Sequence, residues 1–233
     1  PMIHPAQGAT LGWNCKLGRA YALEGGFYFC GGIFEWLQKQ MRFIENPAQS
    51  ADVAFSVDDT MGVYFSTTFF GATASVVNDF ARGTIVGLNV AADTRHIVRA
   101  ALESIGYQVR AVASGMTRAA QDANRNMQLT SISIDGGVSK NKFVMQFITD
   151  MLDVRVGACE DTEATSLGAL YMSGVANGLW KSFDDLHKLY RPTRVYEPAF
   201  SKEKRQELME RWNIATEATL LWGDRMAKRQ EQG

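Results

Sequence analysis

Hydrophobic and polar positions along the chain follow two periods, one typical of strands and one typical of helices. Residues 9–26 have the pattern of a β-hairpin whose turn lies near Lys16 to Gly18. Other stretches are rich in β-branched or aromatic residues and predict further strands: 62–71, 83–90, 129–135 and 154–157.

Between the strands, apolar residues recur at helical spacing. Asp93 is the predicted N-cap of a long helix, and Gly178 is the predicted stop of another. The predicted helices, with the apolar residues that share one face, are 29–43 (Ile33, Phe34, Leu37, Met41), the helix after Asp93 (Ile97, Ala101, Ile105, Val109, Val112), 140–152, 162–178 and 201–222 (Leu208, Trp212, Ala215, Trp222).

Strands that alternate with helices predict an α/β fold, with helices packed on a sheet. No internal repeat or low-complexity segment interrupts the pattern. We therefore expect residues 1–233 to form one domain, with residues 201–233 as its final amphipathic helix.

Composition narrows the choice of partners. Apolar residues make up 46% of the chain, charged residues 21%, and the net charge is −1. So small a charge provides no field that would attract nucleic acid or an anionic membrane, and no apolar run approaches the ~20 residues of a membrane-spanning helix. We expect neither partner.

The termini and the cysteines suggest a location. No stretch resembles a signal peptide, and Cys15, Cys30 and Cys159 are odd in number and widely spaced, as expected for reduced thiols. We therefore expect a cytoplasmic protein. The chain starts at Pro1 and soon enters a strand-like stretch, so we also expect it to be part of a longer protein.

The stretch "SIDGGVSKN" (133–141) combines a strand end, two glycines and the start of a helix. Ligands of open α/β sheets bind at the carboxyl ends of strands, and glycine lets a ligand approach the main chain. Gly136 and Gly137 therefore fit a phosphate or ribose site, with Asn141 as a donor or acceptor. From these residues alone, the favoured interpretation is a tight strand-to-helix turn, with Asp135 capping the helix.

Seven motifs that follow one another along the chain resolve this choice. They are "YALEGG" (21–26), "GGIFEWL" (31–37), "GVYF" (62–65), "ARGTIVGL" (81–88), "HIVRAALESIGYQV" (96–109), "DGGVSKNKFVMQF" (135–147) and "EATSLGALYMSGVANGLW" (163–180). The ordered set resembles the C-terminal half of the FGGY carbohydrate kinases, and within that family it is most similar to the glycerol kinases.

The resemblance implies an actin-like (ribonuclease H-like) ATPase lobe, with a mixed sheet flanked by helices. It also implies transfer of the γ-phosphoryl group of ATP, assisted by Mg²⁺, to a hydroxyl of a small polyol or sugar, with glycerol as the first candidate. A homo-oligomer is expected as well. By the same resemblance, the adenosine-binding positions are Gly31, Glu35, Gly136, Gly137 and Asn141.

The family's phosphate loops, polyol contacts and catalytic aspartate all precede the segment that matches Gly8. We therefore expect the 233-residue chain to be inactive on its own and assign no catalytic residue in it. Four carboxylates could face a cleft, but we interpret them as caps or surface groups: Asp135, Glu160, Asp161 and Glu163.

Two positions depart from the family pattern. Glu35 replaces a usual amide, and the loop 72–80 lacks the usual proline and tryptophan. Because of these departures, a second interpretation stays open, in which the protein is a non-catalytic relative or interaction module that retains the fold. The departures also keep open a kinase for a pentulose or another polyol.

Overall fold

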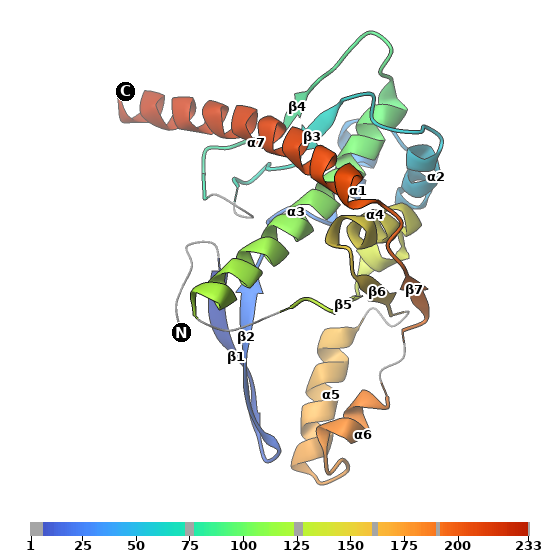
Figure 1. The fold of residues 1–233 in the computed structure, drawn as a ribbon, viewed down its shortest axis with the longest axis vertical. Helices are drawn as coiled ribbons and strands as arrows, with labels where there is room; N and C mark the ends of the chain where they lie inside the picture. The colour runs from blue at the N-terminus through green and yellow to red at the C-terminus, as the bar shows by residue number, and fades with distance from the viewer. Residues whose placement is uncertain (1–6, 73–76, 124–127, 160–162, 190–191, 233) are drawn as a thin grey trace.

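The computed structural model describes residues 7–72, 77–123, 128–159, 163–189 and 192–232 (Figure 1). Some residues that the sequence singled out lie outside the described residues. They are residues 73–76 of the loop 72–80, Glu160 and Asp161. The elements, in chain order, are β1 (Gln7–Cys15), β2 (Gly18–Gly25), α1 (Gly32–Glu35), the π-helical turn η1 (Trp36–Gln40), the 3₁₀ turn η2 (Pro47–Gln49), α2 (Ser50–Phe55), β3 (Tyr64–Ser66), β4 (Thr84–Val86), α3 (Thr94–Asp122), β5 (Ser131–Ile134), the 3₁₀ turn η3 (Gly137–Lys140), α4 (Lys142–Leu152), β6 (Arg155–Ala158), α5 (Ala164–Ala176), α6 (Phe183–His187), β7 (Arg194–Tyr196) and α7 (Lys202–Glu231).

The described strands divide among three small sheets. β1 and β2 form the predicted hairpin, in which Cys15 pairs with Gly18, and β3 pairs with β4 in antiparallel fashion. The third sheet is mixed, because its central strand β6 is parallel to β5 and antiparallel to β7. The predicted alternation of strands and helices is confirmed, although β3, β4 and β5 are shorter than predicted and the described strands are not joined in one sheet.

α3 is the central helix of the molecule (Figure 1). The side chain of Asp93 accepts a hydrogen bond from the Arg95 N–H at 2.9 Å, which confirms the predicted N-cap. Ala101 and Ile105 are fully buried, and the first half of α3 packs against α2 and α4. The core therefore forms where these three helices meet.

A buried ion pair lies in this core. The Arg99 Nε is 2.9 Å from Oε1 of Glu103, and the Tyr107 hydroxyl donates to Oε2 at 3.2 Å. Arg99 also donates to the carbonyls of Ala54 and Val57, which joins α2 to α3. Burial raises the pKa of Glu103, although the hydrogen bonds from Arg99 and Tyr107 act in the opposite direction.

α7 crosses the body from its Ser201 cap. Trp212 is buried, as predicted, whereas Trp222 is 54% exposed, so its predicted place on the buried stripe is wrong. Ten residues correspond to about 2.8 turns, which rotates position 222 about 80° away from position 212. The stripe continues instead at Gly223, where an added Cβ would lie 2.5 Å from Oδ1 of Asn78.

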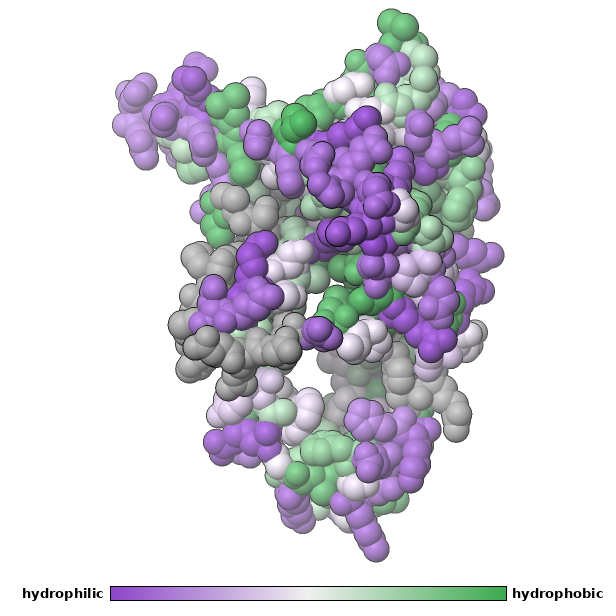
Figure 2. All heavy atoms as spheres, viewed as in Figure 1, coloured by the Kyte–Doolittle hydropathy of each residue, from purple (hydrophilic) through white to green (hydrophobic). Residues whose placement is uncertain are grey.

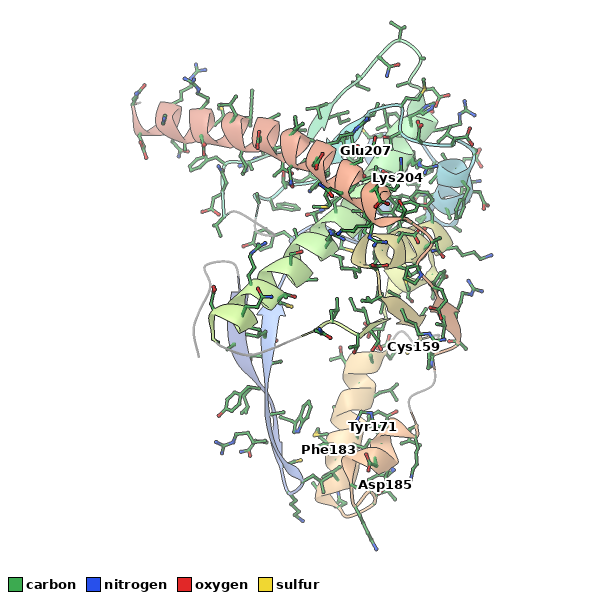
Figure 3. All side chains as sticks on the ribbon, in the orientation of Figure 1. Cys159, Tyr171, Phe183, Asp185, Lys204 and Glu207 are labelled. Atoms are coloured by element: carbon green, nitrogen blue, oxygen red, sulfur yellow. The ribbon has the colours of Figure 1, made fainter. Side chains whose placement is uncertain are left out.

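The hairpin and the pair α5–α6 form the lower part of the molecule. Phe183 of α6 is labelled in Figure 3. Its ring contacts Trp13 of β1 with ring centroids 5.4 Å apart, and Lys16 donates to the carbonyl of Ala176 at 3.0 Å. α5 is an apolar helix, yet of its residues only Val175 is buried. Figure 2 shows apolar atoms exposed at this lower end and a hydrophilic surface over the first turns of α7.

The segment 29–43 is helical over a shorter range than predicted. α1 begins at Gly32, and η1 ends at Gln40 with a wider, π-helical turn. Ile33 and Leu37 are fully buried as predicted, whereas Met41 lies beyond the helix and is 38% exposed. Within the part of the chain that the structure describes, no helix is long and apolar enough to cross a membrane.

The three cysteines are free thiols, as predicted from their number and spacing. Burial raises the pKa of Cys30 to about 11, so this thiol stays protonated at neutral pH.

Candidate functional site

The paired glycines after β5 play different roles. Gly136 has φ 77° and ψ −174°, a conformation that essentially only glycine adopts. Gly137 has no such conformation, and a Cβ added to it would meet nothing within 4 Å. The turn therefore explains Gly136 but does not explain Gly137, whose missing side chain leaves open space.

Asn141 is the N-cap of α4, which begins at Lys142 after the 3₁₀ turn η3. The predicted helix start at residue 140 and the predicted cap at Asp135 are therefore wrong. The reason is the inserted 3₁₀ turn, which moves the first α-helical residues away from the end of β5. Asn141 lies before the first turn of α4 and not on it.

The side chain of Asn141 is held at both ends. Its Oδ1 accepts from the Val144 N–H at 3.0 Å, and its Nδ2 donates to Oγ of Ser50 at 2.9 Å. The hydroxyl of Ser50 in turn donates to the carbonyl of Pro47 at 2.6 Å. An amide has two N–H donors and two acceptor lone pairs, so Asn141 retains one of each for a ligand.

Gly31 is the N-cap of α1 and Glu35 is its last residue, and both are exposed. A Cβ at Gly31 would also meet nothing within 4 Å. Glu35 is 60% exposed and forms an ion pair with Lys39, one turn further along. The hydrogen bond and the charge of Lys39 lower the pKa of Glu35, so the carboxylate that replaces the family's amide is charged but compensated.

The candidate site has two halves, one at Gly31 and Glu35 and the other in the 136–141 segment, and hydrogen bonds connect them only indirectly. Among the described residues, none joins Gly31 or Glu35 to the 136–141 segment. Gln38 of η1 donates to the Glu45 carbonyl at 2.8 Å, and the Glu45 N–H donates to Oε1 of Gln49 at 3.1 Å. Gln49 directly precedes Ser50, the partner of Asn141.

An open pocket of about 780 Å³ lies along this connection. None of the five residues predicted for the site lines it. The pocket is lined instead by residues next to the site: Lys39, which forms an ion pair with Glu35, and Gln49, which precedes Ser50, the partner of Asn141. Its lining consists of Gln38, Lys39, Arg42, Phe43, Ile44, Glu45, Gln49 and Val53.

Sequence reasoning missed Ser50 and Lys39. Lys39 follows Glu35 at the i,i+4 spacing of a helical ion pair, so the pairing of these two residues could have been predicted from the sequence. Ser50 is 91 residues from Asn141, and no local signal connects the two. Within the described ranges, no group of three or more His, Cys, Asp or Glu side chains is arranged to hold a metal ion.

Comparison with known families identifies one match. The profile of the FGGY family of carbohydrate kinases, C-terminal domain, matches residues 5–177. Similar proteins include the glycerol kinase of Thermoanaerobacter sp. (strain X514), 40% identical over 92% of this chain and 42% of that protein. The glycerol kinase of Pseudothermotoga lettingae is 39% identical over 91% of this chain. The chain thus spans 42% of the length of these relatives.

Solved structures show the same architecture. Plasmodium falciparum glycerol kinase with ADP superimposes with a TM-score of 0.83 and 31% identity over 93% of this chain and 42% of that one. Xylulose kinase from Lactobacillus acidophilus has a TM-score of 0.75 at 20% identity over 94% of this chain and 43% of that one, a likeness of fold alone. The expected actin-like ATPase lobe is confirmed.

Proposed function

The chain belongs to the FGGY family of carbohydrate kinases as its C-terminal domain, and from this premise we propose that it is the nucleotide-binding lobe of a polyol kinase. The complete protein would transfer the γ-phosphoryl group of ATP to a hydroxyl of a small polyol or sugar. Glycerol is the first candidate.

The observation that carries this proposal is the open space at Gly137. Neither the backbone conformation of Gly137 nor the packing around it requires glycine, because an added Cβ would meet nothing within 4 Å. A ligand that lies against the main chain does require glycine. Gly31 has the same open surroundings, and so do Gly8, Gly26 and Gly168, so the family resemblance is what assigns Gly31 and Gly137 to the site. The similarity to a glycerol kinase solved with ADP supports a nucleotide as this ligand.

Asn141 is the polar group that we assign to adenosine. Its amide retains one N–H and one lone pair after its bonds to Ser50 and Val144, which suits a ribose hydroxyl or a base nitrogen. Glu35 would lie at the edge of this site, where Lys39 compensates its charge. The residues present therefore fit the adenosine part of ATP.

The described residues do not provide a metal centre, because they include no group of three or more possible ligands. Mg²⁺ stays a prediction from the family resemblance, and we derive no role in holding it for the residues of this chain. The cytoplasmic location and the homo-oligomer also stay predictions.

Glycerol is favoured over other acceptors by the named relatives. Those at 34–40% identity are glycerol kinases, whereas the xylulose and gluconate kinases among the solved structures are only about 20% identical. A pentulose or another polyol is the next candidate.

The test is a phosphorylation screen of the complete protein that carries this sequence. With ATP and a panel of glycerol, other polyols and ketoses, we expect ADP release to be fastest with glycerol. Fastest turnover of a ketose would replace glycerol by that substrate class. Nucleotide binding without phosphorylation of any acceptor would contradict the kinase and support the non-catalytic alternative.

A further inference from the structure

We propose that Ser50 is a positioning residue for nucleotide binding, acting through the side-chain amide of Asn141. Ser50 is fully buried, so it lies out of direct reach of a ligand, and its hydroxyl is within hydrogen-bond distance of Asn141. The inference deepens the proposed function and rests on it, because Asn141 must contact the adenosine part of the nucleotide.

The direction of each hydrogen bond fixes the amide. The single hydroxyl proton of Ser50 is used toward the Pro47 carbonyl at 2.6 Å, so Oγ can only accept from its other neighbour. That neighbour must then be the NH₂ group of Asn141, at 2.9 Å. Independently, the Val144 N–H at 3.0 Å requires an oxygen at the other end of the amide. A flipped amide would bring NH₂ against the Val144 N–H and draw the Ser50 proton away from Pro47.

This arrangement goes beyond what a helix cap requires. An N-cap needs only an oxygen that accepts from the first turn, and aspartate or serine would serve as well as asparagine. An aspartate at 141 would place a second oxygen against the lone pairs of Ser50. Ser50 therefore selects an amide at this position and orients the remaining N–H of that amide.

Ser50 is itself held in place. It begins α2, whose Phe55 ring contacts the Phe143 ring of α4 with centroids 5.2 Å apart. Asn141 is 8% exposed, so little water is available to replace Ser50 as the acceptor of its amide. Loss of the Ser50 hydroxyl would consequently leave an amide N–H without an acceptor and free the amide to rotate.

The test measures ADP affinity of the complete protein that carries this sequence by titration, together with thermal unfolding. Ser50→Ala is expected to weaken ADP binding about threefold to tenfold, the effect of one misplaced hydrogen bond. In a double-mutant cycle with Asn141→Ala, the same change is expected to have no further effect, because Ser50 acts through Asn141. Ser50→Thr, which keeps a hydroxyl, should restore part of the affinity.

Ser104→Ala is the matched control. Ser104 is also fully buried, donates to a carbonyl three residues earlier (Ala101, 2.7 Å) and contacts another side chain, Thr67, at 3.0 Å. We expect Ser104→Ala to lower the unfolding temperature without changing the ADP affinity of the folded protein. In ¹⁵N-correlated NMR spectra, Ser50→Ala but not Ser104→Ala should shift the side-chain amide signals of Asn141.

The two possible failures can be told apart. If the complete wild-type protein binds no ADP, the proposed function fails and this inference fails with it. If the complete wild-type protein binds ADP but the Ser50→Ala variant binds it equally well, the positioning role alone is overturned. The same holds if Ser50→Ala costs as much affinity in the Asn141→Ala background as in the wild type.

Discussion

The indole ring of Trp212 on α7 lies nearly parallel to the ring of Tyr107 on α3, with centroids 4.7 Å apart and planes inclined by 15°. Both side chains are buried in the core. This stacked pair joins the last helix of the chain to the central helix, so α7 is part of the folded core and not an appendage.

Replacement of Trp212 should therefore destabilise the whole fold. For Trp212→Ala we expect the free energy of unfolding to fall by about 3–5 kcal/mol, the usual cost of truncating a large buried aromatic side chain. Trp222→Ala is the control on the same helix, because Trp222 is 54% exposed, and its effect should stay within about 0.5 kcal/mol. Denaturant unfolding followed by circular dichroism compares them, and equal losses would contradict the placement of α7.

The buried pair of Arg99 and Glu103 predicts a pH-dependent defect. Arg99→Met leaves the Glu103 carboxylate buried without its cation, and we expect a loss of about 3–5 kcal/mol at neutral pH. Burial already raises the pKa of Glu103, and removal of Arg99 raises it further. A carboxyl whose folded-state pKa is raised contributes fully to the free energy of unfolding below its unfolded-state pKa. That contribution is lost as the pH rises through the folded-state pKa. The deficit of the variant should therefore shrink at acidic pH.

Unfolding curves at several pH values test this sign. Arg211→Met is the control, because its partner Glu207 is about half exposed, and it should change stability little at any pH. A deficit of Arg99→Met that grows on acidification would contradict the assignment of Glu103 as the titrating group.

The two glycines of the turn should respond in opposite ways. Gly137→Val is expected to weaken nucleotide binding and leave the unfolding temperature almost unchanged, because the new side chain enters open space. Gly136→Ala should instead lower stability by about 1–3 kcal/mol, because alanine is strained at φ 77° and ψ −174°. ADP titration and thermal unfolding of the same samples separate the effects. Unchanged ADP affinity in Gly137→Val would favour a purely structural turn.

Glu35→Gln tests the charge at the edge of the site. The substitution removes a negative charge and frees Lys39 from its ion pair, so anionic nucleotide should bind up to about fivefold more tightly. The gain should be larger at low ionic strength, because salt screens exposed charges. Lys39→Met, which leaves Glu35 uncompensated, should weaken binding. ATP titrations of all three forms at low and high salt test this prediction. Identical affinities would show that Glu35 does not lie in the site.

The 233-residue chain on its own is expected to be catalytically inactive. The chain spans 42% of the length of its glycerol kinase relatives. The family resemblance implies that the phosphate loops and the catalytic aspartate precede the matching segment. A coupled assay for ADP release with ATP and glycerol should show no rate above buffer. The glycerol kinase of Thermoanaerobacter sp. in the same assay is the positive control, and turnover abolished by a substitution within this chain would contradict the prediction.

Local signals made much of the fold predictable. Asp93 as a cap, Gly178 as the stop of a helix and the β-hairpin were each predicted from a few adjacent residues, and the structure confirms them. Gly178 follows the end of α5 and has φ 79°. Ordered motifs predicted the family in the same way. Such signals work because caps and turns are decided by neighbours in sequence.

Features that depend on packing between distant segments could not be predicted. The Ser50–Asn141 bond spans 91 residues, and the 3₁₀ turn before α4 moved the cap from Asp135 to Asn141. Trp222 was misassigned because a stripe written in steps of three or four drifts around a long helix. The site residues themselves came from family resemblance, and their binding roles stay predictions.

Gly223 gives the last helix a fixed register. Trp212 and Gly223 are eleven residues apart, about three turns, so they face the same side of α7. One contacts Tyr107, and the other lies so close to Asn78 and Ala81 that a Cβ would come within 3 Å of both. Inserting or deleting one residue between them would rotate one contact by about 100° relative to the other. The chain should therefore tolerate length changes after Met226 but none between residues 212 and 223.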